Sequence, residues 1–269
     1  MPELAPMKTV IFIPARYAST RYPAKPLATL RQADGSTKSL IQMSWEAASA
    51  IRGVDAVYVA TDDARIAEAA RSFGADVVMT DPARENGTAR VAEALENSGI
   101  DADLVINFQG DAPLTPPWFV EALIKAMRAD ATIAMATPVL RCDRATYDAL
   151  KDDRAQGRVG GTTAVFDARM NALYFSKEVL PYIDPGKVAE PIPVFHHVGV
   201  YAYRPAALAA YVAHPVCPLE TLEGLEQLRF LHAGMPVRCV EVQARGRVFW
   251  ELNNPSDVPR IEAALAAMA

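Results

Sequence analysis

A chain of 269 residues with 51% hydrophobic and 22% charged side chains is too apolar to remain disordered, and it is long enough to bury a sizeable core. We expect one large α/β domain, with or without an appended lobe, rather than two independent domains. The formal net charge of -5 and the pI near 5.5 exclude a general attraction to nucleic acid or to anionic membranes. Any anionic substrate must therefore be held by local cations.

The cysteines and the amino terminus indicate the compartment. Cys142, Cys217 and Cys239 are scattered and odd in number, a pattern that fits neither a disulfide framework nor a metal site. We interpret them as buried thiols in a reducing compartment. The first residues include Glu3, and the apolar run that follows is stopped by Pro14, which is not typical of a signal peptide. No apolar stretch reaches the roughly 20 residues that span a bilayer, so the expected location is the cytoplasm.

Short β-rich runs alternate with helical patterns in the first half of the chain. The runs at 9–13, 56–59, 76–79 and 104–108 are largely apolar, which is typical of strands covered on both faces of a parallel sheet. One helical pattern covers 39–51, and another starts after Asp62 as its N-cap and ends at Gly74. The alternation predicts an α/β fold with a doubly wound, mostly parallel sheet.

The pattern loosens between residues 141 and 195. A charged run at 151–154, the Gly160-Gly161 pair and a crowd of prolines from Pro181 to Pro193 are loop signals. We expect a smaller inserted lobe or dimerisation region there, within a single domain of residues 1–269. Regular structure then resumes with a strand at 198–203, a helix over about 219–232, a strand near 237–242 and a terminal helix from Pro255.

The loop after the first strand, residues 14–27, is the strongest chemical signal. It places Arg16, Arg21 and Lys25, with the hydroxyl of Ser19, at the carboxyl end of a strand, where open α/β sheets bind ligands. The planar arginine side chains suit phosphate oxygens, and the compact lysine charge suits the phosphorus under attack. These residues are candidates for a polyphosphate site. The alternative is a basic surface loop.

A second loop, residues 107–113, also follows a buried strand directly. Its Asp111 is the first candidate for a magnesium ligand, because Mg²⁺ usually takes only one or two protein carboxylates beside substrate phosphates. The alternative is an ordinary Gly-Asp turn.

A third loop, residues 80–90, leads into a helix whose free N–H groups suit a base carbonyl or a phosphate. Asn86 and Thr88 are equally compatible with ordinary helix caps.

Together these segments resemble the CMP-Kdo synthetase family, the 3-deoxy-manno-octulosonate cytidylyltransferases, over nearly the whole chain. The matching segments run in order: Pro-Ala-Arg, Ser-Thr-Arg and Lys-Pro-Leu within 14–27, Ala-Thr-Asp-Asp at 60–63, Gly-Thr at 87–88, Gln-Gly-Asp at 109–111, Ala-Leu-Tyr-Phe-Ser at 172–176, His-Val-Gly-Val-Tyr-Ala-Tyr-Arg at 197–204, and Leu-Glu at 219–220 through Leu-Glu-Gln-Leu-Arg at 225–229. The resemblance implies a nucleotide-sugar transferase fold, CTP and a small acidic sugar as substrates, Mg²⁺ as cofactor and a homodimer.

The resemblance also implies roles for individual residues. The implied nucleotide-binding positions are Pro14, Ala15, Arg16, Ser19, Arg21, Lys25, Asn86, Gly87, Thr88, Arg90 and Gln109. The implied sugar-binding positions are Gln109, His197, Tyr201, Glu226 and Gln227, and the catalytic group comprises Arg16, Lys25 and Asp111. Two of these have structural alternatives: Tyr201 as a packing residue of its strand, and Glu226 as an ion-pair partner of Arg229 on one helix. His196 and His214 are expected at the surface.

The chain departs from the family pattern at several positions. Ala24 stands where the family has glycine, Ala89 replaces an acid before Arg90, and Ala112 replaces a glutamate after Gln-Gly-Asp. Asn253 occupies the position of a second metal-binding aspartate. If residues 250–253 are extended, Glu251 projects to the same face as Asn253, so its carboxylate could restore the missing charge; the alternative is a solvated strand residue.

The reaction that these residues suggest is attack of a sugar hydroxyl, the anomeric one of a 2-keto-3-deoxy acid, on the α-phosphorus of CTP, with pyrophosphate leaving in line. Such chemistry depends on positioning and charge neutralisation rather than on a covalent nucleophile. Two alternatives stay open at this point. One is a cytidylyltransferase for another acidic sugar, either sialic-acid-like or a modified octulosonate, and the other is a non-catalytic homologue that binds nucleotide or sugar.

Overall fold

The central strand of the structure is β1 (Thr9–Ala15), and it is apolar on both faces. Ile11 and Ile13 pack into one hydrophobic core, and Val10 and Phe12 pack into a second core on the opposite face, all with no exposed surface. Such a strand has to be covered by helices on both sides. The computed structural model describes residues 7–18, 22–159, 161–247, 251–252 and 254–268.

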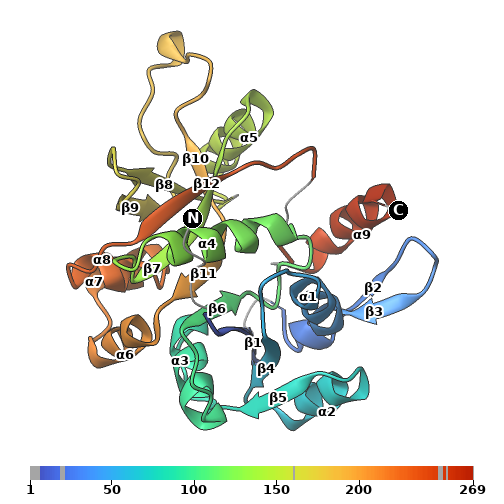
Figure 1. The fold of residues 1–269 in the computed structure, drawn as a ribbon. Coiled ribbons are helices and arrows are strands. Elements are labelled where there is room, and N and C mark those ends of the chain that lie inside the picture. Colours follow the sequence, from blue (N-terminus) through green and yellow to red (C-terminus); the bar gives the residue numbers. More distant parts are fainter. Residues whose placement is uncertain (1–6, 19–21, 160, 248–250, 253, 269) are drawn as a thin grey trace.

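Within these residues, one mixed sheet has the strand order β5-β4-β1-β6-β11-β7-β10-β8-β9, with β12 added beside β7 (Figure 1). The strands besides β1 are β4 (Ala56–Thr61), β5 (Asp76–Met79), β6 (Leu104–Phe108), β7 (Met135–Arg141), β8 (Thr162–Phe166), β9 (Ala172–Ser176), β10 (Phe195–His197), β11 (Val200–Tyr203) and β12 (Arg238–Val242). Strands β5, β4, β1 and β6 are parallel, as predicted. The second half is antiparallel, except that β12 runs parallel to β7. The predicted α/β class is confirmed.

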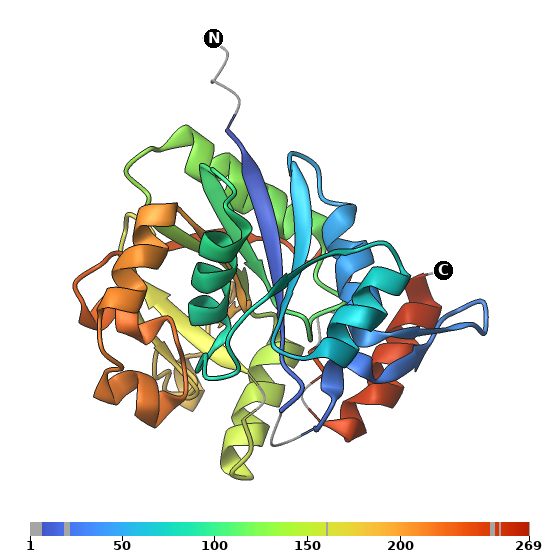
Figure 2. The same cartoon turned by 90° about the horizontal axis from the view of Figure 1, so that it is seen from below.

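Helices cover both faces of the sheet (Figures 1 and 2). The core on one face is formed with α1 (Leu40–Ser49), α2 (Ala64–Ser72) and α4 (Pro117–Ala129). The core on the other face is formed with α3 (Gly87–Ser98), α6 (Pro205–Ala213) and α8 (Leu228–His232). The N-cap of α2 is Asp63, one residue later than predicted, because the carboxylate of Asp62 is engaged by Arg90. No helix within the described ranges is long and apolar enough to cross a membrane.

The strand predicted at 198–203 is interrupted. Residues 195–203 run antiparallel to β7 as two short strands, β10 and β11, separated by Val198 and Gly199. On their other side the two strands have different partners, β8 for β10 and β6 for β11. The break therefore lies where the parallel half of the sheet meets the antiparallel half.

The prediction of a single helix over residues 219–232 is wrong. The segment forms two short helices, α7 (Pro218–Glu223) and α8, separated by a turn at residues 224–227. Gly224 ends α7 in the left-handed conformation, with φ of 62°, which glycine adopts without steric cost. The periodicity of the apolar residues continues through the turn, so the sequence pattern did not reveal the break. Glu226 and Gln227 lie in this turn rather than on a helix.

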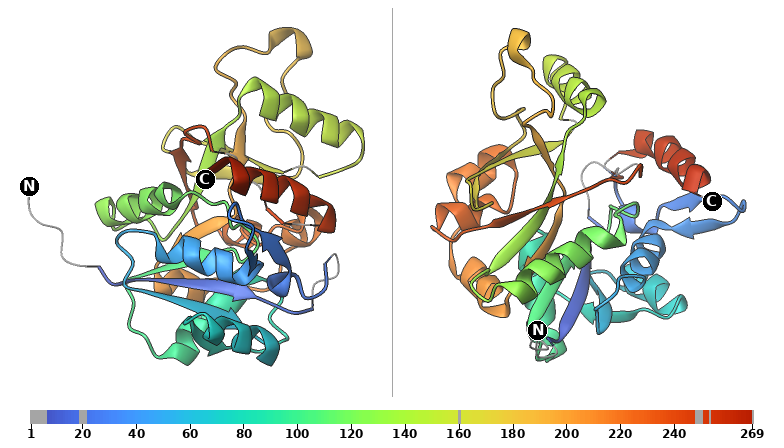
Figure 3. Two further views of the ribbon diagram at one scale, coloured as in Figure 1. Left: turned by 90° about the vertical axis from the view of Figure 1, so that its right-hand side faces the viewer. Right: turned by 45° about the horizontal axis from the view of Figure 1, so that its top comes forward.

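Residues 141–195 include α5 (Arg144–Ala155), the β8-β9 hairpin and a short turn of 3-10 helix at Pro185–Lys187. Figure 3 shows α5 and the long loop between β9 and β10 projecting beyond the end of the sheet. A small separate core of Cys142, Tyr147, Leu150, Ile192 and Val194 supports this segment. Its role as a dimerisation region stays a prediction.

The carboxyl-terminal part packs beside α1. A hairpin of β2 (Thr29–Arg31) and β3 (Thr37–Ser39) shares a small core with Leu252 and with Ile261 of α9 (Val258–Met268). As predicted, the terminal helical segment begins at Pro255, here as a turn of 3-10 helix, and the backbone N–H of Asn254 donates to Asp257 at 2.6 Å. This packing carries residues 251–252 back to the edge of the central sheet.

Candidate active site

The carboxyl ends of β1 and β6 meet the amino-terminal end of α3 at one edge of the sheet. Gly87, the first residue of α3, lies so close that an added methyl group would be 3.3 Å from the side-chain nitrogens of Asn107 and Gln109. It would also lie 3.5 Å from Cγ of Pro14. The three loops singled out in the sequence therefore converge, as expected where parallel strands end together.

The first loop is closed at its base and held against α2. The backbone N–H of Ala24 donates to the carbonyl of Tyr17 at 3.1 Å. The guanidinium of Arg65 lies 3.4 Å from the centre of the Tyr17 ring, and Asp63 holds that guanidinium by two hydrogen bonds. Arg16 is exposed directly after β1. Ser19 and Arg21, also predicted to bind the nucleotide, lie outside the described residues.

An ion pair joins the first loop to the second. The Nζ atom of Lys25 lies 2.5 Å from Oδ2 of Asp111, and both side chains are partly exposed. The cation and the carboxylate that the sequence assigned to one site are thus in direct contact across 86 residues of chain. Of the two side chains, the carboxylate of Asp111 is the one whose oxygens could bind a metal ion beside substrate phosphates.

Ala24 adopts a left-handed conformation, with φ of 56° and ψ of 23°. It is the N-cap of the short 3-10 helix at Lys25–Leu27, so its backbone geometry directs Lys25 toward Asp111. A residue with a Cβ atom pays about 1–2 kcal/mol in this region, whereas glycine does not. This explains physically why the family pattern has glycine here, and it identifies a strained position in this chain.

The amino-terminal end of α3 already has an anion bound to it. Asn86 caps the helix by accepting the N–H of Ala89 at 2.9 Å, so its interpretation as a cap is correct. The N–H of Thr88 donates to Oε2 of Glu226 at 2.9 Å. Free N–H groups and the helix dipole favour an anionic group at this point. Here the protein itself provides that group from the 224–227 turn.

Arg90, predicted to bind the nucleotide, is 2% exposed. Its guanidinium donates to the hydroxyl of Thr80 at 2.5 Å and to Asp62 at 3.2 Å. A buried arginine with these partners supports the loop from behind and presents no charge to the surface. We therefore replace the predicted nucleotide-binding role of Arg90 with a structural one, because its guanidinium is bound to Thr80 and Asp62.

The predicted sugar-binding residues form one polar group beside Gln109. Glu226 accepts from Nε2 of Gln109 at 3.4 Å, and the hydroxyl of Tyr201 donates to Oε1 of Gln227 at 3.2 Å. The Nε2 atom of Gln227 is buried without a hydrogen-bond partner among the described residues. Burial raises the pKa of the Glu226 carboxyl. The alternative ion pair of Glu226 with Arg229 is wrong, because Arg229 binds Glu220 and Glu85 instead.

His197 is buried, as are Tyr201 and Gln227 of the same group. It is 5% exposed, and its Nε2 atom lies 2.9 Å from the hydroxyl of Thr137. Burial lowers the pKa of His197 to about 3, so its ring is neutral at neutral pH. A surface position was expected for His196 and His214. The expectation is wrong for His196, which is half-buried and whose pKa is lowered to about 4 by burial. It is correct for His214, which is exposed.

Glu251 lies at the same edge. The backbone N–H of Leu252 donates to the carbonyl of Asp111 at 2.8 Å, which brings residues 251–252 alongside the second loop. Oε1 of Glu251 is 3.4 Å from the place that a methyl group on Gly199 would take, and Gln109 adjoins the same place at 3.7 Å. Glu251 is therefore not a fully solvated residue. Asn253, the other half of that hypothesis, lies outside the described residues.

Asp111 and Glu251 are the carboxylates at this edge whose oxygens have the chemistry to bind a divalent cation. Within the ranges that the structure describes, no three His, Cys, Asp or Glu residues are grouped as a complete metal site. Mg²⁺ does not need such a group, because it commonly binds one or two carboxylates, substrate phosphates and water.

Three residues from the sequence motifs lie at or behind this edge and were not assigned to either substrate. Asn107 is fully buried, and neither atom of its side-chain amide has a hydrogen-bond partner among the described residues. Glu220 and Arg229 form a buried ion pair behind Asn86. A polar residue inside an otherwise apolar strand was the available signal for Asn107; nothing in the local sequence indicated the contacts of the other two.

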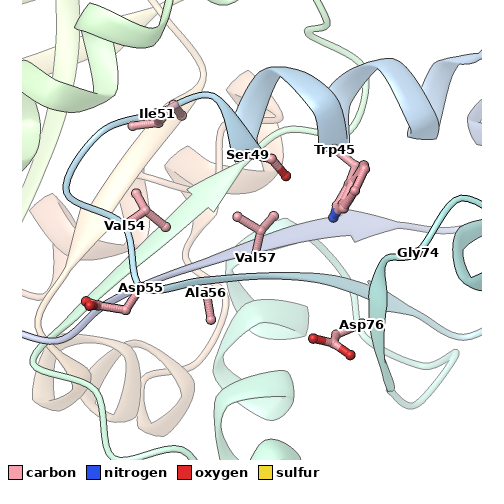
Figure 4. Close-up of a pocket in the computed structure, with 9 residues that line it drawn as sticks. All are labelled: Trp45, Ser49, Ile51, Val54, Asp55, Ala56, Val57, Gly74 and Asp76. Carbon is pink, nitrogen blue, oxygen red and sulfur yellow. The ribbon is translucent and has the colours of Figure 1, made fainter.

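A cavity of about 230 Å³ lies elsewhere, and Figure 4 shows its lining. It is formed at the amino-terminal end of β4, opposite the edge where the loops converge. Its lining residues are Trp45, Ser49, Ile51, Val54, Asp55, Ala56, Val57, Gly74 and Asp76. Asp55 is used structurally, since it accepts the N–H of Thr9 at 2.7 Å.

Comparison with known proteins decides the family. Residues 10–238 match the family described as cytidylyltransferase. The chain belongs to the cytidylyltransferase family. It is accordingly a CTP-dependent nucleotidyltransferase, and the alternative of a non-catalytic binding protein is not supported.

Two relatives and one solved structure are similar to this cytidylyltransferase over nearly its whole length. The 3-deoxy-manno-octulosonate cytidylyltransferase of Maricaulis maris (strain MCS10) is 44% identical, over 97% of this chain and 98% of the relative. The 8-amino-3,8-dideoxy-manno-octulosonate cytidylyltransferase of Shewanella woodyi is 39% identical, over 97% and 99%. A structure of CMP:2-keto-3-deoxy-manno-octonic acid synthetase complexed with CTP superimposes with a TM-score of 0.83 at 35% identity, covering 97% of this chain and 100% of that one.

The strain at Ala24 gives a first prediction for this cytidylyltransferase. Ala24→Gly removes the left-handed penalty, and the greater freedom of glycine in the unfolded chain offsets part of the gain. We expect a net stabilisation of about 0.5–1 kcal/mol, or about 1–3 °C in Tm. Ala28→Gly is the control, because Ala28 has φ of -60° and should lose stability. A lower Tm for Ala24→Gly, measured by calorimetry, would contradict the strain argument.

Proposed function

We propose that the protein transfers CMP from CTP to the anomeric hydroxyl of a 2-keto-3-deoxy acidic sugar, 3-deoxy-manno-octulosonate or a close relative, and releases pyrophosphate. The observation that carries the proposal is the convergence of the Arg16–Lys25 loop, Asp111 and the Gln109–Glu226 group at one edge. The names of the relatives, which specify octulosonates, support the sugar class.

In this proposal the residues of the chain act mainly by position and charge. Arg16 and Lys25 bind the triphosphate and neutralise charge that moves onto the departing pyrophosphate. The amino-terminal end of α3, with Asn86, Gly87 and Thr88, receives the polar edge of the nucleotide. Gln109 lies between the nucleotide and the sugar, and Tyr201, Glu226 and Gln227 provide hydrogen-bond partners for sugar hydroxyls. Neutral His197 supports Tyr201 from behind, where their rings lie 5.6 Å apart.

We propose Mg²⁺ as the cofactor, held by Asp111 with help from Asn253 or Glu251. When bound, the ion would neutralise phosphate charge and orient the triphosphate. In the free protein the ion pair with Lys25, at 2.5 Å, holds the Asp111 side chain in place.

The decisive experiment measures pyrophosphate release with purified protein. CTP is tested with 3-deoxy-manno-octulosonate, its 8-amino analogue and a sialic acid, and ATP and GTP are tested with the best sugar. We expect activity with CTP and at least one octulosonate, because the residues that bind the nucleotide match the family motif. Activity with a sialic acid alone, or equal use of ATP, would refute the proposal.

The phosphate-binding role of the first loop predicts the behaviour of two variants. Lys25→Ala and Arg16→Ala each should lower kcat by about 100-fold or more, because each removes a cation that stabilises the transition state. Tm should change little, since neither side chain belongs to a hydrophobic core. Lys38→Ala is a matched control, because Lys38 forms an ion pair of 2.6 Å with Glu46 away from the converging loops. A Lys25→Ala enzyme with near-normal kcat would show that the assignment is wrong.

The altered metal position predicts a dependence on Mg²⁺. An asparagine carbonyl can coordinate Mg²⁺ but adds no negative charge, so the parent should need more Mg²⁺ than Asn253→Asp. Glu251→Gln should need more than the parent, because a carboxylate beside the site is lost. Initial rates titrated with Mg²⁺, and Mn²⁺ binding by paramagnetic resonance, measure both effects. An Asn253→Asp curve no tighter than that of the parent contradicts the charge argument, and an unchanged Glu251→Gln curve removes Glu251 from the site.

We also propose a homodimer, with residues 141–195 at or near its interface. The projecting shape of this segment and its strongly exposed Tyr182 support the proposal. Sedimentation equilibrium at micromolar concentration tests it, and a monomer would contradict it.

A location in the cytoplasm remains our proposal. It is supported by Cys142, Cys217 and Cys239, which are all buried free thiols, as predicted. Fractionation of cells that produce the protein tests it, and recovery outside the cytoplasm would contradict it.

A further inference from the structure

A buried ion pair lies behind the converging loops and belongs to neither proposed substrate site. Arg229, 5% exposed, donates from Nε and from one terminal nitrogen to the two carboxylate oxygens of Glu220, both at 2.7 Å. The guanidinium also stacks on the ring of Tyr211 at 4.2 Å and reaches Glu85 at 3.1 Å. Such planar, two-point pairing fixes the orientation of both side chains.

One side of this ion pair holds the loop proposed for the nucleotide. Nδ2 of Asn86 donates to the hydroxyl of Tyr211 at 2.8 Å and to Oε1 of Glu220 at 3.3 Å. The other side-chain atom of Asn86, Oδ1, caps α3. The position of the first turn of α3 therefore depends on Glu220, which lies on α7 at a distance of 134 residues along the chain.

The other side of the ion pair holds the turn proposed for the sugar. The backbone N–H of Leu225 donates to the carbonyl of Glu220, and the N–H of Arg229 donates to the carbonyl of Glu226, each at 3.2 Å. The side chain of Glu226 then returns to the N–H of Thr88 at 2.9 Å. The contacts form a closed ring from α3 through Asn86, Glu220 and Arg229 to Glu226 and back to α3.

We infer that Glu220 and Arg229 are positioning residues that hold the Asn86–Thr88 loop and the Glu226–Gln227 turn in one fixed relation. Since neither residue belongs to the proposed substrate contacts, both act through Asn86 and Glu226. The inference rests on the proposed function for its meaning in catalysis. A break at any point of the ring should disturb the binding of both substrates, because each loop is held in part by the other.

The test removes a contact on the nucleotide side of the ring and measures the KM of the sugar. Asn86→Ser keeps a side-chain oxygen that caps α3 and stays neutral, but it removes the donor to Tyr211 and Glu220. We expect the KM of the sugar, at saturating CTP, to rise about fivefold or more, with a smaller change in kcat. Arg229→Lys, which keeps the charge and loses the fork, should raise the KM of both CTP and the sugar by a similar factor.

The matched control is Arg52→Lys. Arg52 forms the same two-point pair with Glu121, at 2.9 Å and 3.1 Å, on the surface beside α4. The Arg52→Lys variant should leave both KM values within about twofold of the parent, because the two-point pairing that it loses lies outside the proposed site. An unchanged sugar KM for Asn86→Ser, or an Arg229→Lys enzyme altered for one substrate alone, would overturn the inference.

Amide hydrogen exchange of the free protein separates this inference from the proposed function. We expect faster exchange at residues 224–229 in Asn86→Ser than in the parent, although the substitution lies at the N-cap of α3. Unchanged exchange there would overturn the inference whatever the enzyme's substrates. A parent that lacks activity with CTP and both octulosonates would instead overturn the proposed function, and the exchange measurement would still decide on the ring.

Discussion

Parallel pairing of β1 with both β4 and β6 determines where chemistry can occur in this protein. It sends the loops after β1 and β6 to the same edge, and the Lys25–Asp111 ion pair shows how closely they meet there. The first turn of α3 reaches the same edge because Gly87 has no side chain to keep it away from Gln109. The other contacts of the site, including those of Glu226, depend on this convergence.

The protein is acidic as a whole, so its affinity for anions has to be created locally. Arg16 and Lys25 provide positive charge on the first loop, and the amino-terminal end of α3 provides oriented N–H groups. In the free protein Glu226 accepts from one of them, the N–H of Thr88, and burial raises the pKa of its carboxyl. A ligand that approaches the first turn of α3 therefore meets the carboxyl group of Glu226 and has to share or displace its hydrogen bond from Thr88.

The sequence was sufficient for the parallel half of the fold because each strand there is a short apolar run followed by a turn signal. It was also sufficient to bring Lys25 and Asp111 together, since strand ends meet by topology alone. It failed where long-range contacts override a local pattern. Arg90 is buried by Asp62 and Thr80, and the helix expected over 219–232 is broken at Gly224. Neither outcome is visible in local periodicity, because both depend on partners distant in the chain.

The interruption of the strand at Val198 and Gly199 has a consequence for how such enzymes diverge. The residues proposed for the nucleotide come from β1, α3 and the end of β6, whereas those proposed for the sugar come from β10, β11 and the 224–227 turn. The two sets touch mainly at Gln109 and along the ring through Glu220. Because Glu226 also accepts from the N–H of Thr88, the acceptor half can diverge without disturbing the donor half only where these contacts are kept.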